Sequence, residues 1–243
     1  MNISINYLNL SYIPKILSND YISKLIINET ILINLKRLDL SYNNLSCSNV
    51  FTFLENNKRC LNLKSLNLSG NNLNDLFFED YIEKKLFERF TKLKRINLDD
   101  NKIGNEMVEI KYRDNIPVNE GINEEIAYKL RLLYKFISEN KNLIELSITK
   151  NDLGNNFILV DNLEKVNSAW EYITKDEKGD TAINCLYSLL WKIKNELMLA
   201  DDEEKKDNGR AKFNLIFDCR KDYNLNSNNF QFDKKMIKFN KEL

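Results

Sequence analysis

The sequence predicts an α/β repeat fold, with parallel strands on one side and helices on the other. The first observation is an eleven-residue pattern, L-x-x-L-x-L-x-x-N-x-L with Ile allowed for Leu, which occurs at 35–45, 63–73, 93–103 and 143–153. The second is the spacing, because the first three copies begin 28 and 30 residues apart, which leaves room for a helix after each strand. The third is the apolar residues at helical spacing between the copies. A strand cannot bury its apolar face alone, so these units are expected to stack.

The copy at 93–103, LKRINLDDNKI, shows how each unit is built. Leu93, Ile96 and Leu98 form one face of a strand, because side chains alternate between the two faces of a sheet. Asn101 then turns the chain, and Ile103 points inward again. The residues between the apolar ones therefore point to the opposite face of the sheet.

These motifs resemble those of the leucine-rich repeat family, and the intervals of 28 to 30 residues resemble its ribonuclease-inhibitor-like subclass, in which a helix follows each strand. The resemblance covers residues 1 to about 155. It implies a solenoid with parallel strands on the concave side and helices on the convex side. It also implies that the motif asparagines are buried and form a structural ladder of hydrogen bonds between turns, namely Asn43, Asn71, Asn101 and Asn151.

Apolar residues at helical spacing predict helices at 21–26, 50–54, 78–90, 122–137, 157–174 and 183–197. The interval before the last motif copy is longer, at 50 residues, and contains an insert at 104–121. Within it, MVEIKYR alternates as a short strand or hairpin does. Such an insert projects from the edge of a repeat stack, either beside the binding face or as a surface loop without a role.

We expect one leucine-rich repeat domain at 1–218, followed by a C-terminal cap or loose tail at 219–243. The domain divides into a cap repeat at 1–34, regular repeats at 35–155, and an enlarged helical repeat with a terminal strand at 156–218. The cap repeat has Ile13 and Pro14 where the asparagine turn should be, as atypical terminal repeats do. The terminal strand is FNLIFD, at 213–218. The alternative is a separate C-terminal region at 157–243.

The charge balance excludes some classes of partner. Lys and Arg together number 36, as do Asp and Glu, so the formal net charge is zero. This argues against nucleic acid or an anionic membrane held by bulk charge, since such binding needs excess cations. We also expect no Sec signal and no membrane span, because the start lacks a basic segment before an apolar run and no long apolar stretch follows.

The sequence lacks the residues of several common catalytic sites. There is no histidine, which excludes Ser-His-Asp and Cys-His nucleophiles and histidine metal sites. The six glycines are isolated, so no phosphate-binding loop is present. The four cysteines lack zinc-site spacing and are expected to be free, buried thiols in a reducing compartment. We therefore expect no enzyme activity, no metal and no cofactor.

The outward positions of successive strands form rows of side chains about 4.8 Å apart. Tyr12 and Tyr42 occupy the turn position just before the asparagine in adjacent repeats, so their rings are expected to stack. Tyr and Arg are enriched among the residues that anchor protein interfaces. The candidate partner-binding residues are Tyr7, Tyr12, Arg37, Asp39, Tyr42, Arg95, Asn97, Asp99 and Glu145. The alternative is that these side chains only solubilise the surface.

Opposite charges lie close together on this face, with Arg37 near Asp39 and Arg95 near Asp99. We expect these pairs to neutralise the face and to provide directional hydrogen bonds.

The sequence thus predicts a monomeric, non-enzymatic scaffold that binds a protein partner on its concave face. The preference for Lys, Asn and Ile is typical of AT-rich coding. Together with the absence of a Sec signal and the eukaryote-like repeat class, it favours a secreted effector of an intracellular bacterium. We expect a cytoplasmic location, or secretion into a host cell without a Sec signal. The alternative function is an adaptor or enzyme whose active part is the region 157–243.

Overall fold

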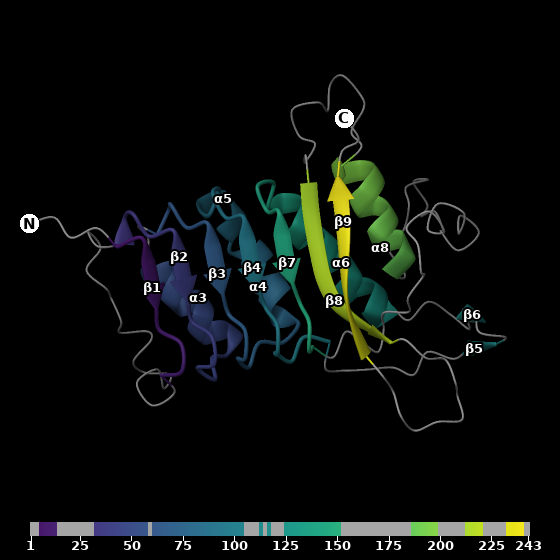
Figure 1. The fold of residues 1–243 in the computed structure, drawn as a ribbon, viewed down its shortest axis with the longest axis horizontal. Helices are drawn as coiled ribbons and strands as arrows, with labels where there is room; N and C mark the ends of the chain where they lie inside the picture. The colour runs from purple at the N-terminus through teal and green to yellow at the C-terminus, as the bar shows by residue number, and fades with distance from the viewer. Residues whose placement is uncertain are drawn as a thin grey trace, which may run out of the picture.

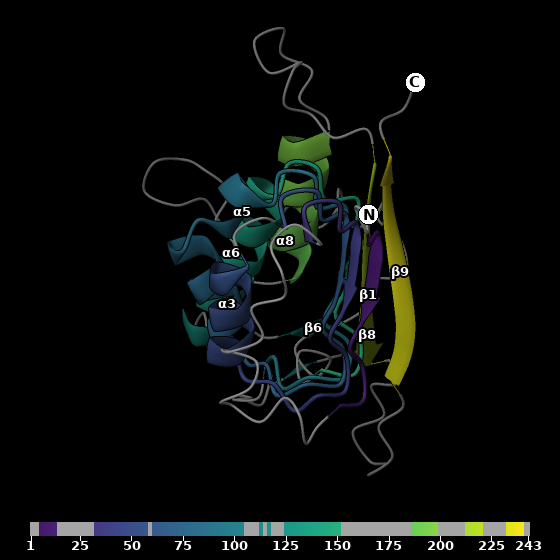
Figure 2. The ribbon, with the colours of Figure 1, turned by 90° about the vertical axis from the view of Figure 1, so that its left-hand side faces the viewer.

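The computed structural model describes residues 5–13, 32–57, 60–104, 112–113, 116–117, 124–151, 186–198, 212–220 and 232–240. One seven-stranded sheet runs along the molecule, and the described helices lie against one of its faces (Figures 1 and 2). In spatial order the strands are β1 (Tyr7–Asn9), β2 (Arg37–Asp39), β3 (Ser65–Asn67), β4 (Arg95–Asn97), β7 (Glu145–Ser147), β8 (Lys212–Arg220) and β9 (Phe232–Asn240). All neighbours are parallel except β8 and β9, which are antiparallel. The predicted α/β class with a mainly parallel sheet is confirmed.

The strands pair in the register that places equivalent motif positions side by side. Leu38 lies opposite Leu66, and Leu66 lies opposite Ile96. The strand predicted from FNLIFD continues the same sheet, because Leu215 of β8 lies opposite Leu146 of β7. Each motif position therefore forms a straight row across the sheet.

The helices are α3 (Cys47–Asn56), α4 (Leu76–Glu83), α5 (Leu86–Arg89), α6 (Glu124–Glu139), α8 (Leu186–Lys192) and the π-helical turn η3 (Ile193–Met198). A capping box starts α3, since Ser46 and Asn49 bond to each other's backbone N–H groups. The helix predicted at 78–90 is instead divided into α4 and α5, because Lys85 adopts a left-handed φ of 49°. The helices predicted at 21–26 and 157–174 lie outside the described residues.

The core between the sheet and the helices is shared by several repeats. Leucines and isoleucines from the strands fill one side of it, including Leu38, Leu66 and Ile96. Aromatic rings from α3, α4 and α6 fill the other. The ring of Phe77 lies 5.4 Å from that of Phe51 and 6.1 Å from that of Phe136. Each helix thus buries its apolar face against its own repeat and the next one.

Two segments beyond the regular repeats also form strands. In the insert, β5 (Tyr112–Arg113) pairs with β6 (Ile116–Pro117) as a short antiparallel ladder, and β5 is the part of the predicted strand at 107–113 that the structure describes. At the C-terminal end, β8 continues to Arg220, and β9 lies within the region for which a cap or loose tail was expected. Ile237 of β9 packs against the core opposite Leu215, which accounts for the added strand.

Candidate functional site

In the described part of the chain, one face of the sheet carries no helix, and we call it the open face (Figure 2). The register places the outward side chains of β1 to β4 and β7 in two rows. The first row is Tyr7, Arg37, Ser65, Arg95 and Glu145, and the second is Asn9, Asp39, Asn67, Asn97 and Ser147. Arg37, Arg95 and Tyr7 are exposed. Side chains that are distant in the sequence therefore form one continuous surface.

The motif asparagines hold this surface in register. The amide of Asn71 donates to Leu40 O at 3.0 Å and to Leu68 O at 2.9 Å, which links two successive turns. Its Oδ1 accepts from Asn43 N and Leu45 N at 3.1 and 3.0 Å. Equivalent amide bonds to carbonyl groups of two turns are made by Asn43, Asn101 and Asn151. These side chains are mostly buried, so their role in the geometry is to satisfy backbone groups.

The residue before each asparagine has a left-handed backbone conformation. The φ angles are 57°, 57°, 64°, 55° and 52° at Tyr12, Tyr42, Gly70, Asp100 and Lys150. In the first four of these turns, the backbone N–H of this residue donates to a carbonyl of the following repeat. A left-handed conformation costs a residue with a Cβ about 1–2 kcal/mol. Only Gly70 avoids that cost, so the neighbouring hydrogen bonds must hold the turn in the other repeats.

Tyr12 and Tyr42 form an exposed aromatic stack at these turns. Their ring centroids lie 4.6 Å apart, with an angle of 8° between the ring planes. Tyr12 is 68% exposed and Tyr42 is 37% exposed. Gly70 provides the space for the stack, since a Cβ at this glycine would lie 2.2 Å from Cδ1 of Tyr42. Sequence reasoning missed this role of Gly70, although its place in the tyrosine row was a signal for it.

The carboxylates of the open face bond to their neighbours. Asp39 accepts from Ser41 through Oδ1 and from Asn67 through Oδ2. Asp99 Oδ1 accepts from Ser147 Oγ and Thr149 N, both at 2.7 Å. Among the described residues, Asp39 forms no ion pair with Arg37 and Asp99 forms none with Arg95, which differs from the expected neutralisation. The carboxyl oxygens instead accept hydrogen bonds from residues of the neighbouring strands, which the sequence analysis did not predict.

Two other predicted site residues have partners on the face. Arg95 Nε lies 3.9 Å from Glu145 Oε1. The Arg95 side chain is 55% exposed and the Glu145 side chain is 35% exposed. Asn97 Oδ1 accepts from Asp99 N at 2.8 Å. Among the described residues, the predicted side chains that are exposed and form no ion pair are Tyr7, Tyr12, Tyr42 and Arg37, while Arg95 has the long contact with Glu145.

The described residues show little that could carry out catalysis. Burial raises the pKa of the Cys47 and Cys60 thiols to about 11, so both stay protonated and unreactive near neutral pH. No three Cys, Asp or Glu side chains of the described ranges gather as metal ligands would. Within those same ranges, no helix has both the length and the apolar character needed to cross a membrane.

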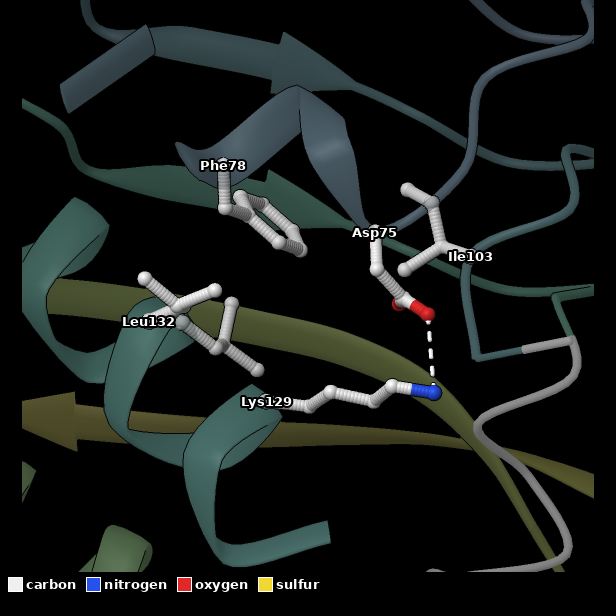
Figure 3. A pocket seen from close by; sticks show the side chains of 6 residues that line it. Asp75, Phe78, Ile103, Lys129 and Leu132 are labelled. Atoms are coloured by element: carbon white, nitrogen blue, oxygen red, sulfur yellow. Dashed lines mark ion pairs between the residues drawn. The ribbon is translucent and has the colours of Figure 1, made fainter. Parts of the chain in front are cut away.

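A small pocket lies between α4 and α6, away from the open face (Figure 3). Phe78, Ile103 and Leu132 line it, and an ion pair of 3.0 Å joins Asp75 Oδ2 to Lys129 Nζ at its side. Its volume is about 10 Å³, which is room for one water molecule. Asp75 also accepts from Gly104 N at 2.8 Å. These contacts join α4, α6 and the start of the insert, and the pocket is too small for an organic ligand.

The fold and the site together define an α/β repeat protein whose open sheet face carries exposed Tyr and Arg side chains. No model of a protein family matches the sequence, and no curated protein matches it. Two solved structures that match this chain in part are an actin-binding site 2 structure of leiomodin-1 and the tropomodulin C-terminal domain of Caenorhabditis elegans.

Both structures are distant from this chain. The leiomodin-1 structure is 15% identical with a TM-score of 0.39, and the match covers 59% of this chain and 69% of that one. The tropomodulin domain is also 15% identical, with a TM-score of 0.41, and the match covers 69% of this chain and 81% of that one. At this similarity we infer nothing about the partner of this chain from either protein.

Proposed function

We propose that this protein is a non-enzymatic binding module that contacts a protein partner through the open face. The observation that carries the proposal is the exposed Tyr12–Tyr42 stack. Left-handed backbone costs each tyrosine about 1–2 kcal/mol, whereas a stacked aromatic pair contributes about 0.5–1.5 kcal/mol beyond its burial. The arrangement therefore does little for the stability of the fold. Asp100 and Lys150 adopt the same left-handed backbone, so what distinguishes Tyr12 and Tyr42 is their exposed rings, and tyrosine is enriched among the residues that anchor protein interfaces.

The chemistry of the neighbouring residues favours a protein surface as the partner. Tyr7 lies beside Arg37 in the first row, and both are exposed. Tyrosine offers a flat apolar ring with a polar end, and arginine offers a planar set of donors, which makes both residues frequent anchors of protein interfaces. The strands beneath these side chains are bonded in register, so the anchors are held in place before binding.

Affinity capture with variants of the face tests the proposal. The tagged wild-type protein and two double variants, Tyr12→Ala/Tyr42→Ala and Arg37→Ala/Arg95→Ala, are compared by quantitative mass spectrometry of the captured proteins. A matched control changes exposed residues on α6, Tyr128→Ala/Arg131→Ala. Thermal unfolding of each variant shows whether it is folded.

Loss of an interface anchor costs about 2 kcal/mol, or a factor of about 30 in affinity. We expect both face variants to lose the same partner by at least about tenfold while the α6 control retains it. If the folded face variants capture every partner as well as wild type does, the open face is not the binding site and the proposal is wrong.

A further inference from the structure

Positive charge gathers where the chain enters β2, β3 and β4. The segments INLKR at 33–37, LNLKS at 61–65 and TKLKR at 91–95 contain six cationic residues and no acidic one. Lys92 donates to Asn62 Oδ1 at 2.5 Å. All six side chains are exposed, and we call the five that follow the basic strip: Lys36, Arg37, Lys64, Lys94 and Arg95.

Backbone hydrogen bonds align the basic strip across the sheet. Lys36 O accepts from Lys64 N and Ser65 N at 2.8 and 3.0 Å. Lys64 O accepts in the same way from Lys94 N and Arg95 N at 2.9 and 3.0 Å. Neighbouring strands lie about 4.8 Å apart, so three lysines of equal charge stand in one row. Like charges that lie this close repel one another, so the charges of the row do not stabilise the fold.

The aspartates of the open face do not pair with the strip. Asp39 and Asp99 lie at the opposite ends of the strands, where their oxygens accept hydrogen bonds from strand-end donors. The first acidic side chain at the entry end is Glu145, which lies 3.9 Å from Arg95 Nε. No other ion pair to the basic strip is present among the described residues. The exposed charges are therefore mainly basic at the edge where the chain enters the strands, whereas Asp39 and Asp99 lie toward the edge where it leaves them.

Exposed apolar groups flank the basic strip. Ile33 is 43% exposed and Leu61 is 48% exposed, and they occupy the same motif position in two successive repeats. Tyr7, which is 53% exposed, lies beside Arg37 on the neighbouring strand. A surface that combines a row of cations with apolar side chains suits a ligand that carries both carboxylates and apolar groups.

We propose that the basic strip binds an acidic segment of the protein partner, whose carboxylates pair with the lysines and arginines while its apolar side chains cover Ile33 and Leu61. This rests on the proposed function and adds the chemistry of the partner. A nucleic acid would leave the apolar groups uncovered, and the zero net charge of the chain provides no bulk attraction for one. The strip also spans only three strands, or about 10 Å.

Fluorescence anisotropy with a defined probe tests this proposal. The probe is a fluorescein-labelled peptide EELEELEELEE, and its neutral counterpart is QQLQQLQQLQQ. The strip variant is Lys36→Glu/Lys64→Glu/Lys94→Glu, and the control with equal charge change is Lys85→Glu/Lys102→Glu/Lys135→Glu, at exposed lysines elsewhere. We expect the wild-type protein and the control to bind the acidic peptide and not the neutral one. The strip variant should lose at least about tenfold in affinity, and wild-type binding should weaken as NaCl rises from about 50 to 300 mM.

Other ligands define the outcomes that would overturn the proposal. A single-stranded oligonucleotide and vesicles of phosphatidylcholine with phosphatidylserine are titrated in the same way. Binding of either one without binding of the acidic peptide would make the strip a nucleic-acid or membrane site. If the strip variant and the control bind the acidic peptide equally well, the basic strip does not bind it and the proposal is wrong.

The failure of this proposal can be told apart from failure of the proposed function. If the strip variant captures the partner normally but the Tyr12→Ala/Tyr42→Ala variant does not, the open face is the binding site and the chemistry assigned to the strip is wrong. If capture is unchanged in both variants, the open face itself is not used.

Discussion

Replacing Asn71 with leucine tests whether the asparagine ladder holds the repeats together. Leucine has a similar volume but cannot form hydrogen bonds, so Asn71→Leu removes the bonds with little change in packing. The carbonyl groups of Leu40 and Leu68 would each keep another amide partner, from Asn43 and Asn101 respectively. The penalty therefore falls mainly on the two N–H groups that donate to Asn71 Oδ1.

Those two N–H groups belong to Asn43 and Leu45, and neither has another acceptor among the described residues. An unsatisfied buried donor costs about 1–3 kcal/mol, so two give a range of about 2–6 kcal/mol. Because turns can relax and admit water, we expect the free energy of unfolding to fall by about 3 kcal/mol. Urea denaturation followed by circular dichroism measures this difference.

The control is Asn142→Leu, since the Asn142 side chain is exposed and donates only to Thr91 O among the bonds described. This change should alter the free energy of unfolding by no more than about 0.5 kcal/mol. If Asn71→Leu lowers the free energy of unfolding by less than about 1 kcal/mol, or by no more than the control does, the asparagine ladder does not stabilise the fold as its hydrogen bonds indicate.

Two further predictions concern the aromatic stack and the thiols. Gly70→Ala should lower the free energy of unfolding by about 1 kcal/mol or more, because residue 70 has a left-handed φ of 64° and its new Cβ would displace the Tyr42 ring. Urea denaturation measures the change, and unchanged stability would mean that the ring does not need this glycine. Burial raises the pKa of the Cys47 and Cys60 thiols from 9.0 to about 11, so the unfolded chain ionises first as pH rises. The contribution of each protonated thiol to the free energy of unfolding is fully present below about pH 9. It should fall by about 1 kcal/mol by about pH 10. A variant Cys47→Ala/Cys60→Ala should show a smaller fall between pH 8 and 10 on urea denaturation, and an equal fall in both proteins would contradict the assignment.

The repeated motif predicted the rows of the sheet well, for a simple reason. Side chains alternate along a strand, and equal motif positions pair when repeats stack in parallel. Leu38, Leu66 and Ile96 are consequently buried in one row, while Arg37 and Arg95 are exposed in another. Each of these placements depends only on local spacing within one motif copy.

Features that the spacing of the motif does not encode were not predictable in this way. The break between α4 and α5 at Lys85 interrupts an apolar pattern that continues through it, and the pattern alone contains no sign of a left-handed residue. The strand β9 was not expected, because its partner β8 is separated from it in the sequence by residues 221–231 and only pairing defines it. The hydrogen bonds of Asp39 and Asp99 likewise involve neighbours on other strands.

Some expectations are still predictions of the sequence alone. They include the ribonuclease-inhibitor-like subclass, the monomeric state, the cytoplasmic location, and secretion into a host cell as a bacterial effector. The separate C-terminal region at 157–243 is another, and of it the structure describes 186–198, 212–220 and 232–240. Limited proteolysis would examine it, since a stable fragment beginning near Phe157 would indicate a separate domain.

The sequence by itself determined the inward and outward positions of each strand and the equivalence of Tyr12 with Tyr42. These follow from the two-residue period of a strand and from the repeated motif, which are local properties. The tertiary structure decided which of the outward side chains bond to their neighbours and which stay exposed. Charges that lie about 30 residues apart in the sequence form one basic strip only after the strands align in register. Asp39 and Asp99 do not pair with the arginines of this strip, because their carboxyl oxygens accept hydrogen bonds from residues of neighbouring strands.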